Sequence, residues 1–353
     1  MSHPQRSILA AVTLFFIAPL VAEFLLGDFP VTWLALVIVL APMYGGGALL
    51  IRELTRRSGR GWPTILLLGV AYAIIEEAFT TQTLFNPDIY GLHAHLLSHA
   101  WIPSLGIGAW WTLFMLNVHP FWSIGVSIAL AEGLFPSPDG LYPPPAGPYQ
   151  SSARTPWLGK VGLYVAAALF AIGIVYNTWY TFHHDPFRAS HTQFIVAALL
   201  VVVFAIAAFL LPPSATLPAS ISTHKILAAP SPWITGSAAF LLGAAVFLTP
   251  ILWNWGAVAL ILAVDLVFLL SLWMFSRLSS WTALHTFSIG AAGALVYTVH
   301  AFISRPIVHA PKGIVLASHV LFLLLALAVI AVAARRTKAA LAASSSLSVP
   351  ASA

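Results

Sequence analysis

The chain contains no cysteine and very little charge. Because none of its 353 residues is a cysteine, a disulfide framework, a thiolate nucleophile and a Cys-ligated metal site are excluded. Only 7% of the residues are charged, whereas about a quarter are charged in a soluble globular domain. Walker, kinase and Gly-x-Ser-x-Gly motifs are also missing. These absences exclude thiol chemistry and the common nucleotide and serine-hydrolase sites.

Apolar residues fill most of the chain instead. They make up 60% of it, and the mean hydropathy is +0.93. This composition indicates a polytopic membrane protein, whose main partner is the lipid bilayer. The formal net charge of +5 does not indicate nucleic acid as a partner, because the basic residues lie beside the predicted spans.

Ten apolar runs of spanning length predict an all-α, polytopic transmembrane helical bundle. In chain order they are Ser7–Leu26, Val31–Ile51, a run that begins at Trp62, Pro103–Phe135, Trp157–Tyr180, Thr192–Leu211, Trp233–Thr249, Trp255–Phe275, Thr282–Phe302 and Gly313–Ala334. Pro103–Phe135 is longer than a bilayer requires and has Pro120 near its middle. It is compatible with one kinked helix or with a re-entrant pair.

The distribution of lysine and arginine predicts the topology. Ten spans with both termini inside leave only Arg188, Arg305 and Lys312 outside, of 15 basic residues. A second crossing within 103–135 would distribute the basic residues almost evenly between the two sides of the membrane. The positive-inside rule therefore favours ten spans in a cytoplasmic membrane.

The proline-rich stretch 136–156 predicts a boundary between two parts of the chain. A four-span half (1–135) precedes this cytoplasmic loop and a six-span half (157–338) follows it. The Ala/Ser-rich residues 339–353 are predicted to be a disordered tail.

The third span contains the most unusual residues of the chain, Glu76 and Glu77. A carboxylate within the hydrocarbon costs a few kcal/mol on insertion scales, so its default interpretation is a function. Hydrogen bonding between helices is the alternative. Adjacent side chains of an α-helix diverge by about 100°, so we expect one glutamate to face the bundle interior, with Tyr72 beside Glu76.

The fourth span offers His119 and Asn117 as partners for the glutamates. His119 is expected to pair with one glutamate or to join it in holding a metal ion, and no other cofactor is predicted. Glu23 and His319 fall in the outer halves of their spans, on the side of the glutamate pair, and are the next candidates for a substrate- or proton-binding site.

The same residues resemble a known family. Glu-Glu in one span followed by a His in the next is similar to the CAAX-protease and bacteriocin-processing (CPBP/Abi) intramembrane proteases, which pair a Glu-Glu-x-x-x-Arg helix with a Phe-x-x-x-His helix. Glu76 and Glu77 match the acids and His119 the histidine, while Thr81 stands at the arginine position. The resemblance implies that Glu76 or Glu77 is a general base, and that His119 stabilises an oxyanion or holds a metal.

Three functions are therefore open. The leading hypothesis is binding or transport of a small molecule or ion through an outward-facing cavity between the third and fourth spans, coupled to protonation of the glutamate pair. The alternatives are a divergent intramembrane protease and a non-catalytic membrane scaffold. The sequence indicates neither the cargo nor the oligomeric state.

Overall fold

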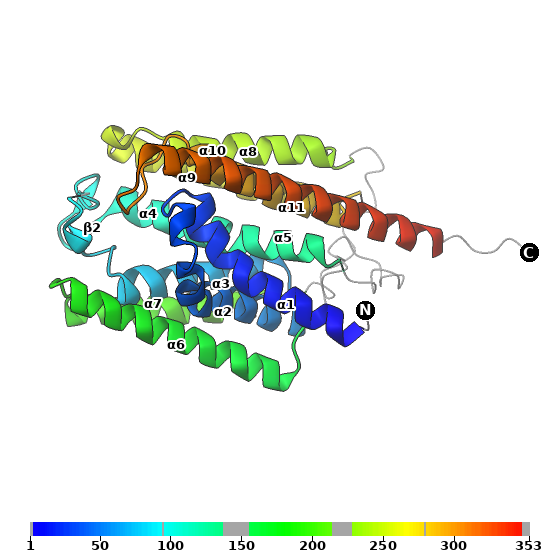
Figure 1. Cartoon of the computed structure of the whole chain (residues 1–353), viewed down its shortest axis with the longest axis horizontal. Coiled ribbons are helices and arrows are strands. Elements are labelled where there is room, and N and C mark those ends of the chain that lie inside the picture. Colours follow the sequence, from blue (N-terminus) through cyan, green and yellow to red (C-terminus); the bar gives the residue numbers. More distant parts are fainter. Residues whose placement is uncertain (1–2, 94, 137–154, 214–227, 279, 348–353) are drawn as a thin grey trace, which may run out of the picture.

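The computed structural model describes residues 3–93, 95–136, 155–213, 228–278 and 280–347. It consists almost wholly of helices that lie roughly along one long axis (Figure 1). The elements are α1 (His3–Pro19), η1 (Leu20–Leu25), η2 (Val31–Trp33), α2 (Leu36–Arg57), α3 (Trp62–Ile74), η3 (Ile75–Thr80), η4 (Ile89–Gly91), β1 (Trp101–Ile102), β2 (Ile107–Gly108), α4 (Ala109–Asn117), η5 (Val118–Val126), α5 (Ser127–Leu134), α6 (Lys160–His184), α7 (His191–Leu210), α8 (Pro232–Leu248), η9 (Ile251–Trp253), α9 (Trp255–Phe275), α10 (Ala283–His300) and α11 (Lys312–Leu347).

The prediction of an all-α polytopic bundle is confirmed. Among the described residues, eight helices are long and apolar enough to cross a membrane, and α8 is a shorter apolar helix. The remaining predicted span corresponds to α10, which packs between α8 and α11 and against α5. Each of the ten predicted runs therefore contains a helix.

The helices form an inner and an outer set. Of the spanning windows, 78% of the α4–α5 segment and 67% of α2 and of α3 are buried within the protein, against 11% of α6 and of α7 and 17% of α9. The outer helices have leucine, valine and isoleucine on their exposed faces, as expected of helices that face lipid. The polar residues of the inner set are thus shielded by other helices.

Packing joins helices from both sides of the predicted loop. α6 lies along α2 and α7 along α3, although the sequence placed α6 and α7 in the second half. The division into 1–135 and 157–338 is therefore not a division into two separately packed bodies. The proposed loop 136–156 falls mainly on residues 137–154, outside the described part of the chain.

The fourth predicted span is one helical segment with a different start. The chain forms a short antiparallel hairpin first, with Trp101 opposite Gly108 in β1 and β2. The helix then runs without a break from Ala109 to Leu134 through α4, η5 and α5. Of the two interpretations, the single distorted helix is confirmed. The predicted start at Pro103 is wrong, because the apolar residues 103–108 belong to the hairpin.

The last helix is longer than predicted. α11 continues to Leu347, so residues 339–347 are helical rather than disordered. Alanine has the highest helix propensity, and it dominates this stretch. Residues 348–353 lie outside the described part of the chain.

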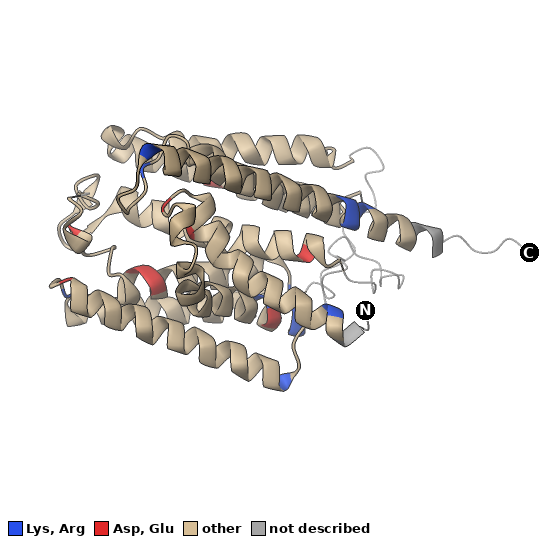
Figure 2. Cartoon of the chain, viewed as in Figure 1, with Lys and Arg blue, Asp and Glu red and all other residues tan. Residues whose placement is uncertain are grey.

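Basic residues gather at the end of the bundle that holds the start of α1, the end of α2 and the end of the spanning part of α11 (Figure 2). Two of them are buried rather than solvated. Arg52 and Arg56, 1% and 4% exposed, both bind the Glu132 carboxylate, with nitrogen–oxygen distances of 2.9–3.0 Å. Glu53 binds Arg52 at 2.7 Å and accepts from the Trp157 backbone N–H at 2.9 Å. These contacts form a buried ion network that joins the end of α2 to α5 and to the segment before α6.

Candidate functional site

Three π-helical segments carry the ionisable side chains of the site. Glu23 lies on η1, Glu76 and Glu77 on η3, and His119 on η5. Within the described residues these are the π-helical segments of the structure. Pro19 precedes η1 and Pro120 lies within η5, and a proline removes an N–H from the regular i→i−4 ladder. π-helical turns are rare and occur frequently at functional sites.

His119 lies between the two adjacent glutamates. Its Nε2 is 2.7 Å from Glu77 Oε1, and its Nδ1 is 3.2 Å from Glu76 Oε2. All three side chains are at most 7% exposed. The expectation that only one glutamate faces the interior is therefore wrong. An i→i+5 turn holds more residues than an α-helical turn, so neighbouring side chains diverge less and both reach the imidazole.

Tyr44 of α2 extends the contacts to α1. Its hydroxyl lies 2.5 Å from Glu23 Oε1 and also bonds Glu76 Oε1. A phenolic hydroxyl has one proton, so it can donate to only one of the two carboxyl groups. The other carboxyl group must donate its own proton to the phenol oxygen. At least one of Glu23 and Glu76 is therefore a neutral acid in this arrangement.

Hydroxyl groups satisfy the far side of Glu77. The Thr83 hydroxyl donates to Glu77 Oε2, and the Thr81 hydroxyl lies 3.2 Å from the same oxygen. Both threonines follow η3. The residues Glu23, Tyr44, Glu76, His119 and Glu77 thus form a continuous series of contacts across η1, α2, η3 and η5, which we call the carboxyl–imidazole chain.

A comparison with known protein families gives a match to the N-terminal part of the chain. The model of an uncharacterized membrane protein family matches residues 12–205, more than half of the sequence. The chain belongs to this family. No curated protein and no solved structure matches the chain.

The family match covers the carboxyl–imidazole chain completely and runs from α1 into α7. It establishes an integral multi-pass membrane protein. The matched model is not that of the CPBP/Abi proteases, so the resemblance to that family has no support beyond the two short motifs.

Close helix packing brings the members of the carboxyl–imidazole chain together. The Cβ of any larger residue at Gly45 would lie 2.1 Å from the Phe15 carbonyl oxygen, so glycine lets α2 approach α1. At Gly69, such a Cβ would lie 2.8 Å from Pro120 Cα, so glycine lets α3 approach η5. Tyr72 closes one side, with its ring 6.0 Å from that of His119.

The other predicted site residues lie apart from the carboxyl–imidazole chain. Asn117 turns to α9, where its Nδ2 donates to Asp265 Oδ2 at 3.0 Å. His319 is buried on α11 and packs edge-on against Phe302, with 5.5 Å between the ring centroids. The structure therefore unites Glu23, Glu76 and His119 but gives Asn117 and His319 other surroundings.

Tyr44 is the member that the sequence did not reveal. Tyrosine is common in membrane proteins, and an isolated one carries no mark of function. The signal beside it is the run Gly45-Gly46-Gly47, which permits close helix approach.

Glu76, Glu77 and His119 also have the composition of a metal site. One ligand atom from each lies within 4.8 Å of the other two. Carboxylate oxygen and imidazole nitrogen suit Zn²⁺ and other first-row divalent ions. An ion here would replace the direct contact between His119 and Glu77.

Proposed function

We propose that the protein is a proton-coupled carrier of a small molecule, with the carboxyl–imidazole chain as its proton-binding site. The observation that carries the proposal is the unbroken series of contacts from Glu23 to Glu77, buried within spanning helices. Ionisable groups at this depth are expensive and mark proton or ion pathways.

Proton sharing gives the chain two equivalent arrangements. When Glu23 is the acid, it donates to Tyr44, which donates to Glu76. When Glu76 is the acid, both bonds reverse, and a proton has moved from α1 to α3 without leaving the protein. His119 continues the series, because each of its ring nitrogens faces a carboxylate.

Coupling to a conformational change follows from the position of His119. An imidazolium at His119 would hold η5 against η3 through its hydrogen bond to Glu77 and its ion pair with Glu76. Protonation of a glutamate weakens one of these contacts. η3 and η5, already outside regular α-helical geometry, are then free to shift relative to each other.

The test is proton movement in proteoliposomes that contain a trapped pH dye. Hydrophobic amines, amino acids and divalent cations are added in turn under an imposed pH gradient. We expect at least one class to move protons through the wild type and not through E76Q/E77Q. Asp88→Asn, the same chemical change in the loop beyond η3, serves as the control and should retain the flux. Equal flux in wild type and E76Q/E77Q, or none with any class, would overturn the proposal.

A second candidate is a metal-dependent hydrolase, such as a divergent intramembrane peptidase. The ligand spacing of Glu76, Glu77 and His119 favours it. One divalent ion per chain in the purified protein, lost in H119A, would support this candidate. Proton flux that withstands a strong chelator would support the carrier instead.

The protein is proposed to lie in the cytoplasmic membrane with both termini inside. The asymmetry of basic residues supports this placement. The scaffold alternative is less attractive, because five connected polar groups on four elements, four of them buried, exceed what helix packing requires.

A further inference from the structure

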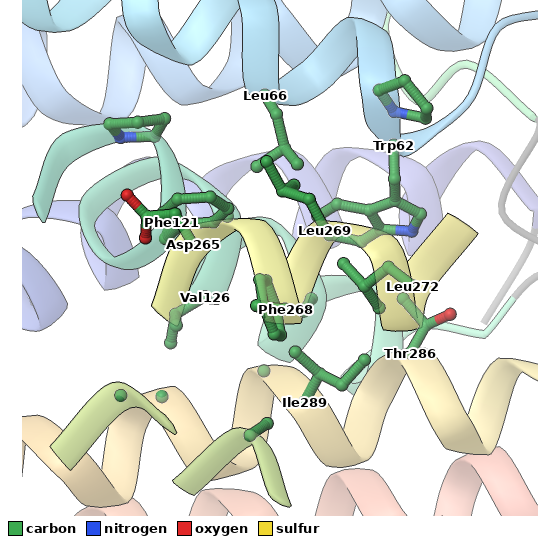
Figure 3. Close-up of a pocket in the computed structure, with 18 of the residues that line it drawn as sticks. Trp62, Leu66, Phe121, Val126, Asp265, Phe268, Leu269, Leu272, Thr286 and Ile289 are labelled. Carbon is green, nitrogen blue, oxygen red and sulfur yellow. The ribbon is translucent and has the colours of Figure 1, made fainter. Parts of the chain in front are cut away.

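A cavity of about 560 Å³ lies beside the carboxyl–imidazole chain, at the end of the bundle where α3 begins. It occupies the space between α3, η5–α5, α8, α9 and α10, and Figure 3 shows Trp62 and Asp265 at opposite ends of it. Its walls are mainly apolar, with Leu66, Phe268 and Leu269 among them. It is on the opposite side from the cavity that the sequence predicted between the outer parts of the third and fourth spans.

Two polar groups converge at the Asp265 end. Asp265 lies near the middle of α9, and within the described part of the chain no basic side chain pairs with it. Its hydrogen-bond partner is Asn117, which is 2% exposed and donates through Nδ2. Asn117 Oδ1 is buried and has no partner among the described residues. The Asp265 end of the cavity therefore combines a carboxylate that has no cationic partner with a buried amide oxygen that has no donor, both among the described residues.

We infer that this cavity binds an amphipathic primary or secondary amine, with its ammonium group between Asp265 and Asn117 Oδ1 and its apolar part among the side chains of α3 and α9. A carboxylate in the hydrocarbon needs a cation, and the amide oxygen needs an N–H donor. An ammonium with at least two N–H bonds satisfies both. A quaternary ammonium lacks the donor, a neutral alcohol lacks the charge, and an anion is repelled.

The shape of the cavity agrees with this ligand class. Phe121 lies beside Asp265 in Figure 3, and Phe268 packs edge-on against Phe121, with 5.6 Å between the ring centroids. Cations are attracted to aromatic faces. Leu272 and Ile289, farther from Asp265, line a space that an alkyl or aryl group fills.

The cavity shares η5 with the proton site. Asn117 and Pro120, both lining the cavity, flank His119 in the sequence. The inference therefore names the cargo class of the proposed carrier and rests on that function for the transport step. Binding itself does not depend on it.

The test is equilibrium binding to the purified full chain in detergent, followed by intrinsic tryptophan fluorescence. The probes are 4-phenylbutylamine, its N,N,N-trimethyl analogue and 4-phenylbutan-1-ol, which share one apolar group. We expect the primary amine to bind saturably and at least about tenfold more tightly than the other two. Asp265→Asn should remove this preference.

Two further variants test whether the amine binds in this cavity. Leu269→Trp fills the apolar part of the cavity and leaves Asp265 intact, so it should also abolish amine binding. Asp88→Asn, a carboxyl-to-amide change in the loop beyond η3 and outside the cavity lining, should leave the affinity within about twofold of wild type, a free-energy change well below that of a tenfold effect. Thermal melting establishes that each variant is folded.

Equal affinities for the three probes, or unchanged amine binding in both folded Asp265→Asn and Leu269→Trp, would overturn the inference. Amine binding that persists while proton flux is insensitive to E76Q/E77Q would leave the inference standing and refute only the carrier. Proton flux that depends on the glutamates, without selective binding of the amine, would refute the inference and leave the proposed carrier standing.

Discussion

At Tyr44, one hydroxyl proton serves two carboxyl groups. The contacts to Glu23 and Glu76 require a shared proton whichever acid is neutral. In the proposed carrier, proton transfer between Glu23 on η1 and Glu76 on η3 would depend on this single oxygen atom.

Tyr44→Phe removes this oxygen and keeps the ring. We expect proton flux in proteoliposomes to fall at least about tenfold, since a proton-transfer group is lost. The unfolding free energy should fall by about 1–3 kcal/mol, because two buried carboxyl groups lose a partner. Tyr164→Phe, on the exposed face of α6 and 74% exposed, makes the same change without effect on either measurement. Wild-type flux in Tyr44→Phe would contradict the shared proton.

Single residues of the site differ in how far the sequence predicts them. Glu76, Glu77 and His119 are conspicuous, because an ionisable group within an apolar run has an energetic cost that demands a reason. Tyr44 carries no such cost, and its role arises only where α1 meets α2. Asn117 is predicted as a partner of the glutamates, but its side chain bonds Asp265, on a helix far along the chain.

At the scale of elements, hydropathy predicts where helices lie and not how they are distorted. Trp255–Phe275 is predicted with the bounds that the structure has. The π-helical turns of η1, η3 and η5 are not predicted, because they change hydrogen-bond register without changing composition. These turns determine the geometry of the site, because a regular α-helix would turn Glu76 and Glu77 to different faces.

Gly69→Val tests whether α3 must lie against η5 for the site to form. The new Cβ would meet Pro120 Cα at 2.8 Å, and neither backbone can yield cheaply. We expect a loss of about 1–3 kcal/mol in stability, as in other overpacked interiors, together with loss of proton flux. Gly313→Val is the matched control, because a Cβ there has nothing within 4 Å. Thermal melting and the proton assay measure both effects. Full flux in Gly69→Val would show that the approach of α3 to η5 is dispensable.

At the scale of the whole molecule, the two candidate sites lie in different parts of the chain. The carboxyl–imidazole chain is built from α1 to η5, within the segment that the family model matches. The amine cavity needs α8, α9 and α10 as well, which lie beyond residue 205. η5 belongs to both sites. In the proposed carrier, the proton site therefore lies within the matched segment, and the cargo cavity combines that segment with helices beyond it.

The orientation of the whole molecule decides from which side protons and cargo enter. Two observations support a topology with both termini inside: the charge asymmetry of the sequence and the gathering of basic side chains at one end of the bundle.

The absence of cysteine allows single cysteines to be labelled in an otherwise unreactive chain. Ala339, in the last part of α11, is exposed and can be labelled. We expect Ser58→Cys and Ala339→Cys to react only with reagents that reach the cytoplasm, and Ser98→Cys to react with an impermeant maleimide added outside intact cells. Permeabilised cells should label all three, which controls for accessibility. Labelling of Ser98→Cys and Ala339→Cys from the same side would overturn the ten-span topology, because an odd number of crossings separates them in that arrangement.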